Sequence, residues 1–147
     1  MRYWLPPILW MGIIFWFSTD TFSGSHTGSI LEILLRTIGV SLEPAMLARV
    51  HFLIRKAAHL TAYAILGLLL FRAFRSGNVL RWQLKWAVCA FLIAAAYALL
   101  DEYHQSFTRE RTASLADSLL DMVGSLGALL WMRISSLTRR SARGPAT

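Results

Sequence analysis

The sequence predicts an all-α, polytopic membrane helix bundle with four transmembrane helices. Of its 147 residues, 56% are hydrophobic and only 16% are charged, and the mean hydropathy is positive. A soluble domain of ordinary composition contains about 25% charged residues. The charged residues here also lie between apolar runs rather than along them. These observations favour a membrane protein of one compact domain, in which the net charge of +7 reports orientation rather than nucleic-acid binding.

Four apolar runs, each of about fifteen residues, define the predicted helices: 3–17, 57–71, 86–100 and 118–132. At about 1.5 Å per residue such a run extends over about 22 Å, whereas the hydrocarbon core of a bilayer is about 30 Å thick. The helices must therefore continue into the flanking charged residues. We expect helices over about 3–22, 50–75, 84–105 and 115–136 in a single domain of residues 1–137, followed by a disordered basic tail over 138–147.

The first run and the connection after it have their own signals. The first run opens with Pro6 and Pro7, which a helix tolerates in its first turn. Residues 18–20 offer no A-x-A-like cleavage site, so we expect a retained helix rather than a signal peptide. Residues 30–38 have apolar side chains at helical spacing, which predicts a short amphipathic helix on the outer membrane face. The next helix is expected to start near Pro44.

Basic residues are distributed unevenly between the two sides of the predicted bundle. One side has nine basic residues and no acidic ones: Arg2, Arg72, Arg75, Arg81, Lys85, Arg133, Arg139, Arg140 and Arg143. The opposite side has six basic residues and all eight acidic ones. Lys and Arg are enriched in cytoplasmic loops, so we predict that both termini are cytoplasmic in a cell (inner) membrane protein.

Ionisable residues interrupt the apolar runs on the predicted outer side. Because short carboxylates cannot reach the membrane surface as Lys and Arg can, we expect them to face other helices. Side chains on three helices would then converge in a polar pocket near the outer boundary. The candidate catalytic residues are His59, Asp101, Glu102, Asp117 and Asp121, and the candidate ligand-binding residues are Lys56, Tyr63, Gln105 and Arg111.

This set is compatible with chemistry and with a purely structural role. Carboxylates beside His59 can act as general acid and base, and Lys56 and Arg111 can hold a phosphate or carboxylate group. Charges retained inside a membrane also pair simply to hold helices together, so both alternatives stay open. The sequence has no dense metal-ligand spacing such as H-E-x-x-H, and Cys89 is its only cysteine. We therefore predict no metal centre and no cofactor.

Two segments resemble the two motifs of the VanZ-like family of small bacterial membrane proteins. The first is Arg55-Lys56-Ala-Ala-His59-Leu-Thr-Ala-Tyr63-Ala-Ile-Leu66-Gly67, and the second is Asp101-Glu102-Tyr-His-Gln105-Ser-Phe107 followed by Arg111, Ser114, Asp117 and Gly124. The resemblance covers most of residues 10–130. The chain departs from the family pattern at three places: Ala62 stands where Glu is frequent, Arg109-Glu110 where Pro-Gly is common, and Asp121 where Asn is usual.

The resemblance implies an accessory factor in cell-envelope function or glycopeptide-antibiotic resistance, since the namesake is associated with low-level resistance to teicoplanin. Its expected partners are the bilayer and a lipid-linked cell-envelope precursor or an anionic lipid head group, with no nucleic acid. Two alternatives stay open. The first is an outer-leaflet enzyme acting on a lipid-linked or phosphate-bearing envelope substrate. The second is a small-solute or proton path, for which four short helices leave little room.

Overall fold

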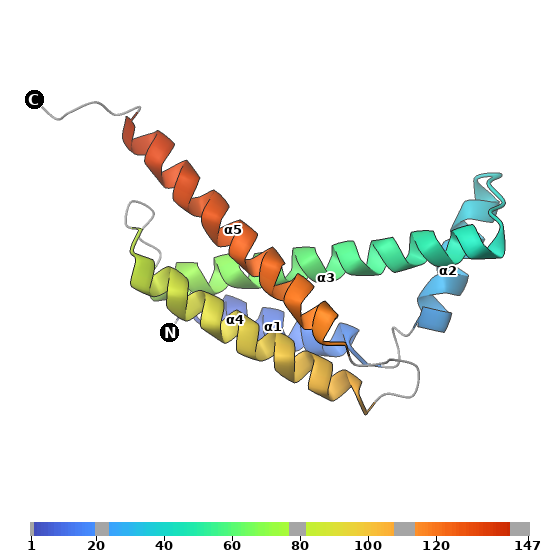
Figure 1. Ribbon diagram of the computed structural model, residues 1–147, viewed down its shortest axis with the longest axis horizontal. Coiled ribbons are helices and arrows are strands. Elements are labelled where there is room, and N and C mark those ends of the chain that lie inside the picture. The colour runs from blue at the N-terminus through green and yellow to red at the C-terminus, as the bar shows by residue number, and fades with distance from the viewer. Residues whose placement is uncertain (1, 20–23, 77–81, 108–113, 142–147) are drawn as a thin grey trace, which may run out of the picture.

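Five helices make up the described part of the chain (Figure 1). The computed structural model describes residues 2–19, 24–76, 82–107 and 114–141, and the side chains of 2–19, 28–76, 82–107 and 114–138. No strand occurs within these segments, which confirms the all-helical prediction. The helices are α1 (Leu5–Phe17), α2 (Gly24–Thr37), α3 (Pro44–Phe74), α4 (Leu84–Gln105) and α5 (Leu115–Ser141).

Three of these helices are long and apolar enough to cross a membrane: α3, α4, and α5 as far as Thr138. They confirm the prediction of a membrane protein built as a helix bundle. Helix α1 is also apolar but has only 13 residues, so it extends over about 20 Å and falls short of a hydrocarbon core of about 30 Å. The fourth span therefore stays a prediction.

The helix ends differ from the expected ones in three places. Helix α1 ends at Phe17 rather than near residue 22, because Thr19 closes a turn: its amide and its hydroxyl both donate to the carbonyl of Trp16, at 3.2 and 2.7 Å. Helix α3 begins at Pro44, which occupies its first turn, so the start expected near this proline is confirmed and the approximate bound of 50 is too late. Helix α5 continues through Ser141, inside the segment expected to be a disordered tail, since Arg is a good helix former and cations favour a helix C-terminus.

Helix α2 coincides with the segment for which an amphipathic helix was expected. Its apolar residues Ile30, Ile33 and Leu34 are exposed, and Arg36 pairs with Glu32 one turn earlier at 2.8 Å. The helix is closed by Gly39, whose φ of +78° lies in the left-handed region that glycine adopts without strain. Helix α2 contacts α3. Its position on the membrane face stays a prediction.

Close backbone approach defines the contact between α3 and α5, which cross each other in Figure 1. A Cβ placed on Gly124 of α5 would lie 2.3 Å from the carbonyl oxygen of Leu60, which is backbone that cannot swing aside. A Cβ on Gly67 of α3 would lie 2.5 Å from the hydroxyl oxygen of Ser125. Small residues at such positions let membrane helices pack through van der Waals contact, the main attraction left between helices inside lipid.

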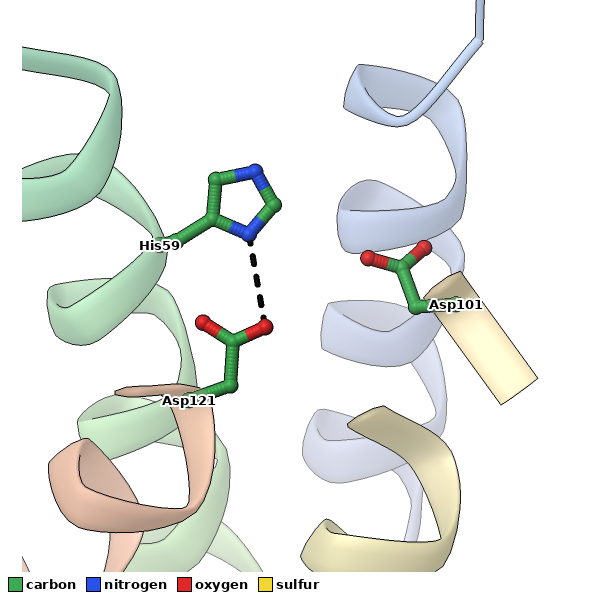
Figure 2. A group of neighbouring side chains, drawn as sticks. All are labelled: His59, Asp101 and Asp121. Atoms are coloured by element: carbon green, nitrogen blue, oxygen red, sulfur yellow. Dashed lines mark ion pairs between the residues drawn. The ribbon is translucent and has the colours of Figure 1, made fainter. Parts of the chain in front are cut away.

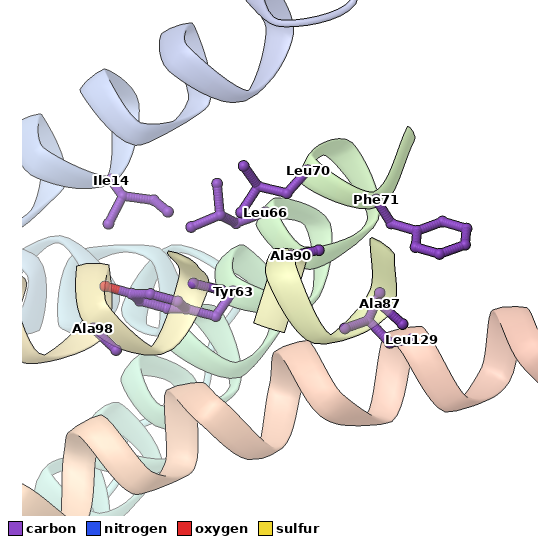
Figure 3. Close-up of a cluster of buried hydrophobic side chains, with 10 residues drawn as sticks. Ile14, Tyr63, Leu66, Leu70, Phe71, Ala87, Ala90, Ala98 and Leu129 are labelled. Atoms are coloured by element: carbon purple, nitrogen blue, oxygen red, sulfur yellow. The ribbon is translucent and has the colours of Figure 1, made fainter. Parts of the chain in front are cut away.

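A stripe of alanines on α4 completes the core. The stripe is buried and consists of Ala87, Ala90, Ala94 and Ala98. Figure 3 shows that larger side chains of α3, among them Leu66 and Leu70, lie on the side of the cluster that faces Ile14 of α1. Helix α1 is fixed to this bundle by two hydrogen bonds: Trp10 Nε1 donates to the carbonyl of Ala62 at 2.9 Å, and the Tyr97 hydroxyl donates to the carbonyl of Met11 at 2.6 Å.

The helices are arranged so that one end of the bundle collects the polar residues. Helices α1 and α4 end at the side where α5 begins, and α3 passes this side near its middle (Figure 1). The starts of α1 and α4 and the ends of α3 and α5 lie toward the opposite side in the same view. The candidate site residues are positioned by this topology.

Candidate functional site

Polar side chains are buried together where α1 and α4 end and α5 begins. Seven of them have relative exposures between 0% and 5%, as low as those of the apolar core. We use the name polar cluster for these residues together with His59 and Tyr63 of α3. The polar cluster thus consists of Ser18, His59, Tyr63, Asp101, Glu102, Gln105, Ser118, Asp121 and Ser125.

At the centre of the polar cluster, three ionisable side chains from three helices point toward a common space (Figure 2). Nδ1 of His59 on α3 lies 3.5 Å from Oδ2 of Asp121 on α5. One ligand atom from each of His59, Asp121 and Asp101 of α4 can be chosen so that all lie within 4.8 Å of one another. The side chain of His59 is 24% exposed, whereas that of Asp121 is 1% exposed. The imidazole therefore stands at the rim, and the carboxylates lie behind it.

Asp101 is held by its own helix and by α1. Gln105, one turn further along α4, donates from Nε2 to Oδ2 of Asp101 at 3.0 Å and to the hydroxyl of Ser18 at 3.3 Å. The i, i+4 spacing brings the two α4 side chains together, and the end of α1 places Ser18 against them. One carboxylate oxygen of Asp101 is thus fixed, and the other, Oδ1, is buried without a hydrogen-bond partner among the described residues.

Two further contacts tie α5 to its neighbours at this end. The amide of Ser114 donates to Oε2 of Glu102 at 2.7 Å, so this carboxylate anchors the segment that leads into α5. Lys56 of α3 forms an ion pair with Asp117 in the first turn of α5, and both side chains are partly exposed. This pair fits the structural role that the sequence left open, because it joins two helices at the rim.

Several buried polar atoms in the polar cluster have no hydrogen-bond partner among the described residues. They include both carboxylate oxygens of Asp121, whose contact with His59 at 3.5 Å is an ion pair but long for a hydrogen bond. The others are Asp101 Oδ1, the Tyr63 hydroxyl, and the hydroxyls of Ser118 and Ser125. Buried polar groups are nearly always satisfied, and inside lipid no bulk water substitutes for a missing partner. This concentration of unpaired acceptors distinguishes the cluster from a structural network.

Charge reinforces that distinction. The carboxylates of Asp101, Glu102 and Asp121 are all buried at this end of the bundle, as is the side chain of Tyr63. Among the described cations near them, Lys56 is engaged with Asp117. His59 is then the group best placed to balance Asp121. Buried carboxylates in such numbers are costly unless something else neutralises them.

These polar residues belong to a chain that matches the VanZ/LLP1 family model over residues 3–136. The chain belongs to the VanZ/LLP1 family. The match covers α1 through most of α5 and confirms the resemblance seen in the two motifs. No curated protein and no solved structure is significantly similar to the chain.

The structure of this VanZ-like protein brings most of the sequence-predicted site residues to one end of the bundle. His59, Asp101 and Asp121 meet at the centre, while Lys56 and Asp117 pair at the rim. Glu102 faces the start of α5, and Tyr63 and Gln105 are buried beside the carboxylates. Arg111 lies outside the described residues, as do Arg109 and Glu110.

Three buried serines of the VanZ-like protein had no part in the predicted site. Ser118 and Ser125 lie on α5 within one turn of Asp121, at i−3 and i+4, and Ser18 follows α1. The helical spacing from Asp121 was a usable signal for the two α5 serines. Ser18 could be found only from the tertiary arrangement.

Proposed function

We propose that this VanZ-like protein is an accessory cell-envelope factor that binds a lipid-linked envelope precursor at the outer membrane face through the polar cluster, and that it thereby lowers the effect of a glycopeptide antibiotic. The single observation that supports this proposal is the group of buried, unpaired acceptors at one end of the membrane helices. Carboxylate and hydroxyl oxygens without donors are suited to a donor-rich partner, such as the sugar hydroxyls and amides of an envelope precursor.

The position of His59 and Lys56 would give such a partner access to the buried carboxylates. Both side chains are partly exposed, and both lie on α3 at the edge of the buried carboxylates. A head group arriving from the membrane surface would meet Lys56 first, and an anionic phosphate would bind this cation by displacing Asp117. It would then reach the acceptors of Asp121 and Asp101 once the partly exposed side chains move aside.

The proposal also includes the orientation of the chain. The ends of α3 and α5 carry the basic residues of the all-basic side, and the polar cluster lies at the opposite end of the bundle. The positive-inside rule then places both termini in the cytoplasm and the polar cluster toward the cell exterior. Cysteine labelling from outside the cell tests this arrangement: Ser106→Cys should react with a membrane-impermeant reagent, and Ser76→Cys should not.

Antibiotic susceptibility tests the function. The chain expressed in a teicoplanin-susceptible host is expected to raise the minimal inhibitory concentration, and Asp121→Asn is expected to abolish that increase at equal membrane abundance. The matched control is Glu32→Gln, since Glu32 lies on α2 and pairs only at an exposed site. An unchanged susceptibility with the wild-type chain, or full protection by Asp121→Asn, would contradict the proposal.

A second candidate function is supported by the contact between His59 and Asp121. An imidazole 3.5 Å from a buried carboxylate, with Asp101 beside them, resembles the acid–base arrangements that enzymes use for proton transfer. The protein would then be an outer-leaflet enzyme acting on a phosphate-bearing lipid held by Lys56. Mass spectrometry of lipid extracts separates the two functions: the enzyme converts a lipid species when the wild-type chain is overproduced, and the binding protein leaves the species unchanged.

A further inference from the structure

We propose that His59, Asp101 and Asp121 form a binding site for one divalent transition-metal ion, Zn²⁺ or Mn²⁺. Each residue comes from a different helix, and one ligand atom from each lies within 4.8 Å of the others. Figure 2 shows the imidazole and the two carboxylates directed at the same space. The site does not depend on the proposed function, because metal binding is measurable without any resistance phenotype.

The geometry is close to that of a coordinated ion. Ligand atoms about 2.0–2.2 Å from a metal are separated from one another by about 3.4 Å in a tetrahedral site. The contact between Nδ1 of His59 and Oδ2 of Asp121, at 3.5 Å, has this separation already. It is long for a hydrogen bond but suits two atoms that share an ion. All ligand atoms of the triad lie within 4.8 Å, so the most distant pair needs to close by at most about 1.4 Å, which side-chain rotation can supply.

The unpaired oxygens provide an independent observation that points to a ligand. Asp121 is fully buried, and neither of its carboxylate oxygens has a hydrogen-bond partner. Asp101 is 4% exposed, its Oδ1 is buried without a hydrogen-bond partner, and Gln105 donates to its other oxygen. A carboxylate that is fixed on one oxygen and open on the other is the usual arrangement of a metal ligand with its supporting hydrogen bond.

Charge balance favours a cation over the alternatives inside the chain. Asp101 and Asp121 together contribute two negative charges, and Lys56 is engaged with Asp117. A divalent ion balances both carboxylates at once and leaves His59 neutral, as a metal ligand must be. Without the ion, the two buried carboxylates repel each other or must take up protons.

The ligand types define the class of metal. Imidazole suits Zn²⁺ and other later transition metals, and carboxylate suits Mn²⁺, whereas Ca²⁺ and Mg²⁺ prefer sites built from oxygen alone. Three protein ligands leave a coordination position open, which is the arrangement of catalytic rather than structural zinc. The sequence contains no local spacing typical of metal ligands, so it predicted no metal centre. The three ligands proposed here are 42 and 20 residues apart along the chain.

Equilibrium binding of ZnCl₂ or MnCl₂ to the purified, EDTA-treated full chain in detergent tests the site. We expect one ion per wild-type chain, with binding weakened by about a hundredfold in His59→Ala, Asp101→Asn and Asp121→Asn, the upper end of the effect reported for perturbing a metal site's supporting shell. The matched control is Asp117→Asn, which removes a partly exposed carboxylate at the rim, outside the triad, and should bind as wild type does. Circular dichroism and gel filtration establish that each variant is folded.

A second measurement keeps the site testable if a variant fails to fold. Saturating Zn²⁺ or Mn²⁺ should raise the unfolding temperature of the wild-type chain by about 5 °C, because the ion binds only the folded state. A folded wild-type chain that binds neither ion overturns the proposal. So does an equal loss of binding in Asp117→Asn, which would assign the ion to the rim rather than to the triad.

Discussion

Both ends of this helix bundle have buried side chains, but these side chains are apolar at one end and polar at the other. At one end, Leu66, Leu70 and Phe71 pack against the alanine stripe of α4, and the arrangement is apolar. At the other end, α3, α4 and α5 bury carboxylates and hydroxyls, several of which have no hydrogen-bond partner among the described residues. The first end stabilises the fold through close packing. The second costs stability, so its retention is better explained by a ligand than by folding.

The largest expected effect comes from the seam that joins the two ends. Gly124→Ala puts a methyl group 2.3 Å from the Leu60 carbonyl oxygen, so α3 and α5 must separate. We expect a loss of about 3 kcal/mol in the free energy of unfolding, measured by thermal denaturation in detergent. Gly127→Ala is the matched control, because a Cβ there meets nothing within 4 Å and alanine favours a helix. Equal stability of the two variants would mean that α3 and α5 do not approach as described.

The apolar end is tested by Phe71→Ala. The side chain is fully buried, and its removal leaves a cavity among α3 and its neighbours. Lipid tails are as apolar as a core, so the loss of packing rather than transfer from water sets the cost, and we expect about 2 kcal/mol of destabilisation. The control is Phe52→Ala, since Phe52 is 58% exposed and should tolerate truncation. A similar loss of stability at both positions would contradict the view that buried packing at the apolar end stabilises the fold.

At the polar end, Asp121→Asn is expected to act with the opposite sign. The amide has nearly the same shape as the carboxylate but no charge, so the cost of burying Asp121 disappears. In EDTA we expect the unfolding free energy to rise by about 1 kcal/mol while ligand or metal binding is lost. The same denaturation assay measures the change. Destabilisation as large as that of Phe71→Ala would show that the carboxylate is a structural partner of His59.

The smallest effect is expected at the rim. Lys56 and Asp117 are both partly exposed, so their ion pair should contribute only about 0.5 kcal/mol. A double-mutant cycle with Lys56→Met and Asp117→Asn isolates this coupling. A coupling energy above about 2 kcal/mol would mean that the pair behaves as a buried ion pair, which would contradict its assignment to the rim.

The sequence predicted the helical membrane bundle and its family because composition and motif spacing are local properties. It also indicated which helices carry the polar residues, since i, i+4 spacing places Asp101 with Gln105 on one face of α4. The meeting of His59 with Asp121 depends on how far α5 slides along α3. That register is set by Gly124 against Leu60, a contact between backbones that no pattern along one segment reveals.

Helix ends were harder to predict than helix faces. Apolar runs define the part of a helix inside lipid, but α3 continues for more than three turns before its run, back to Pro44, where the proline and not the hydropathy indicated its start. The end of α1 depends on a turn made by Thr19, which hydropathy does not describe. The buried Ser18 was missed for the same reason, because its role follows from where that turn places it against Gln105.

The close crossing of α3 and α5 has a consequence for the biogenesis of the protein. The ribosome releases α3 before α4, and α4 before α5. Helix α5 carries Asp117 and Asp121 near its start, and a carboxylate deep in a span opposes insertion by about 3 kcal/mol. When α5 reaches the translocon, Lys56 and His59 are already in the membrane and offer partners for both carboxylates. Insertion of α5 is therefore expected to depend on α3, which already carries the partners of its two carboxylates.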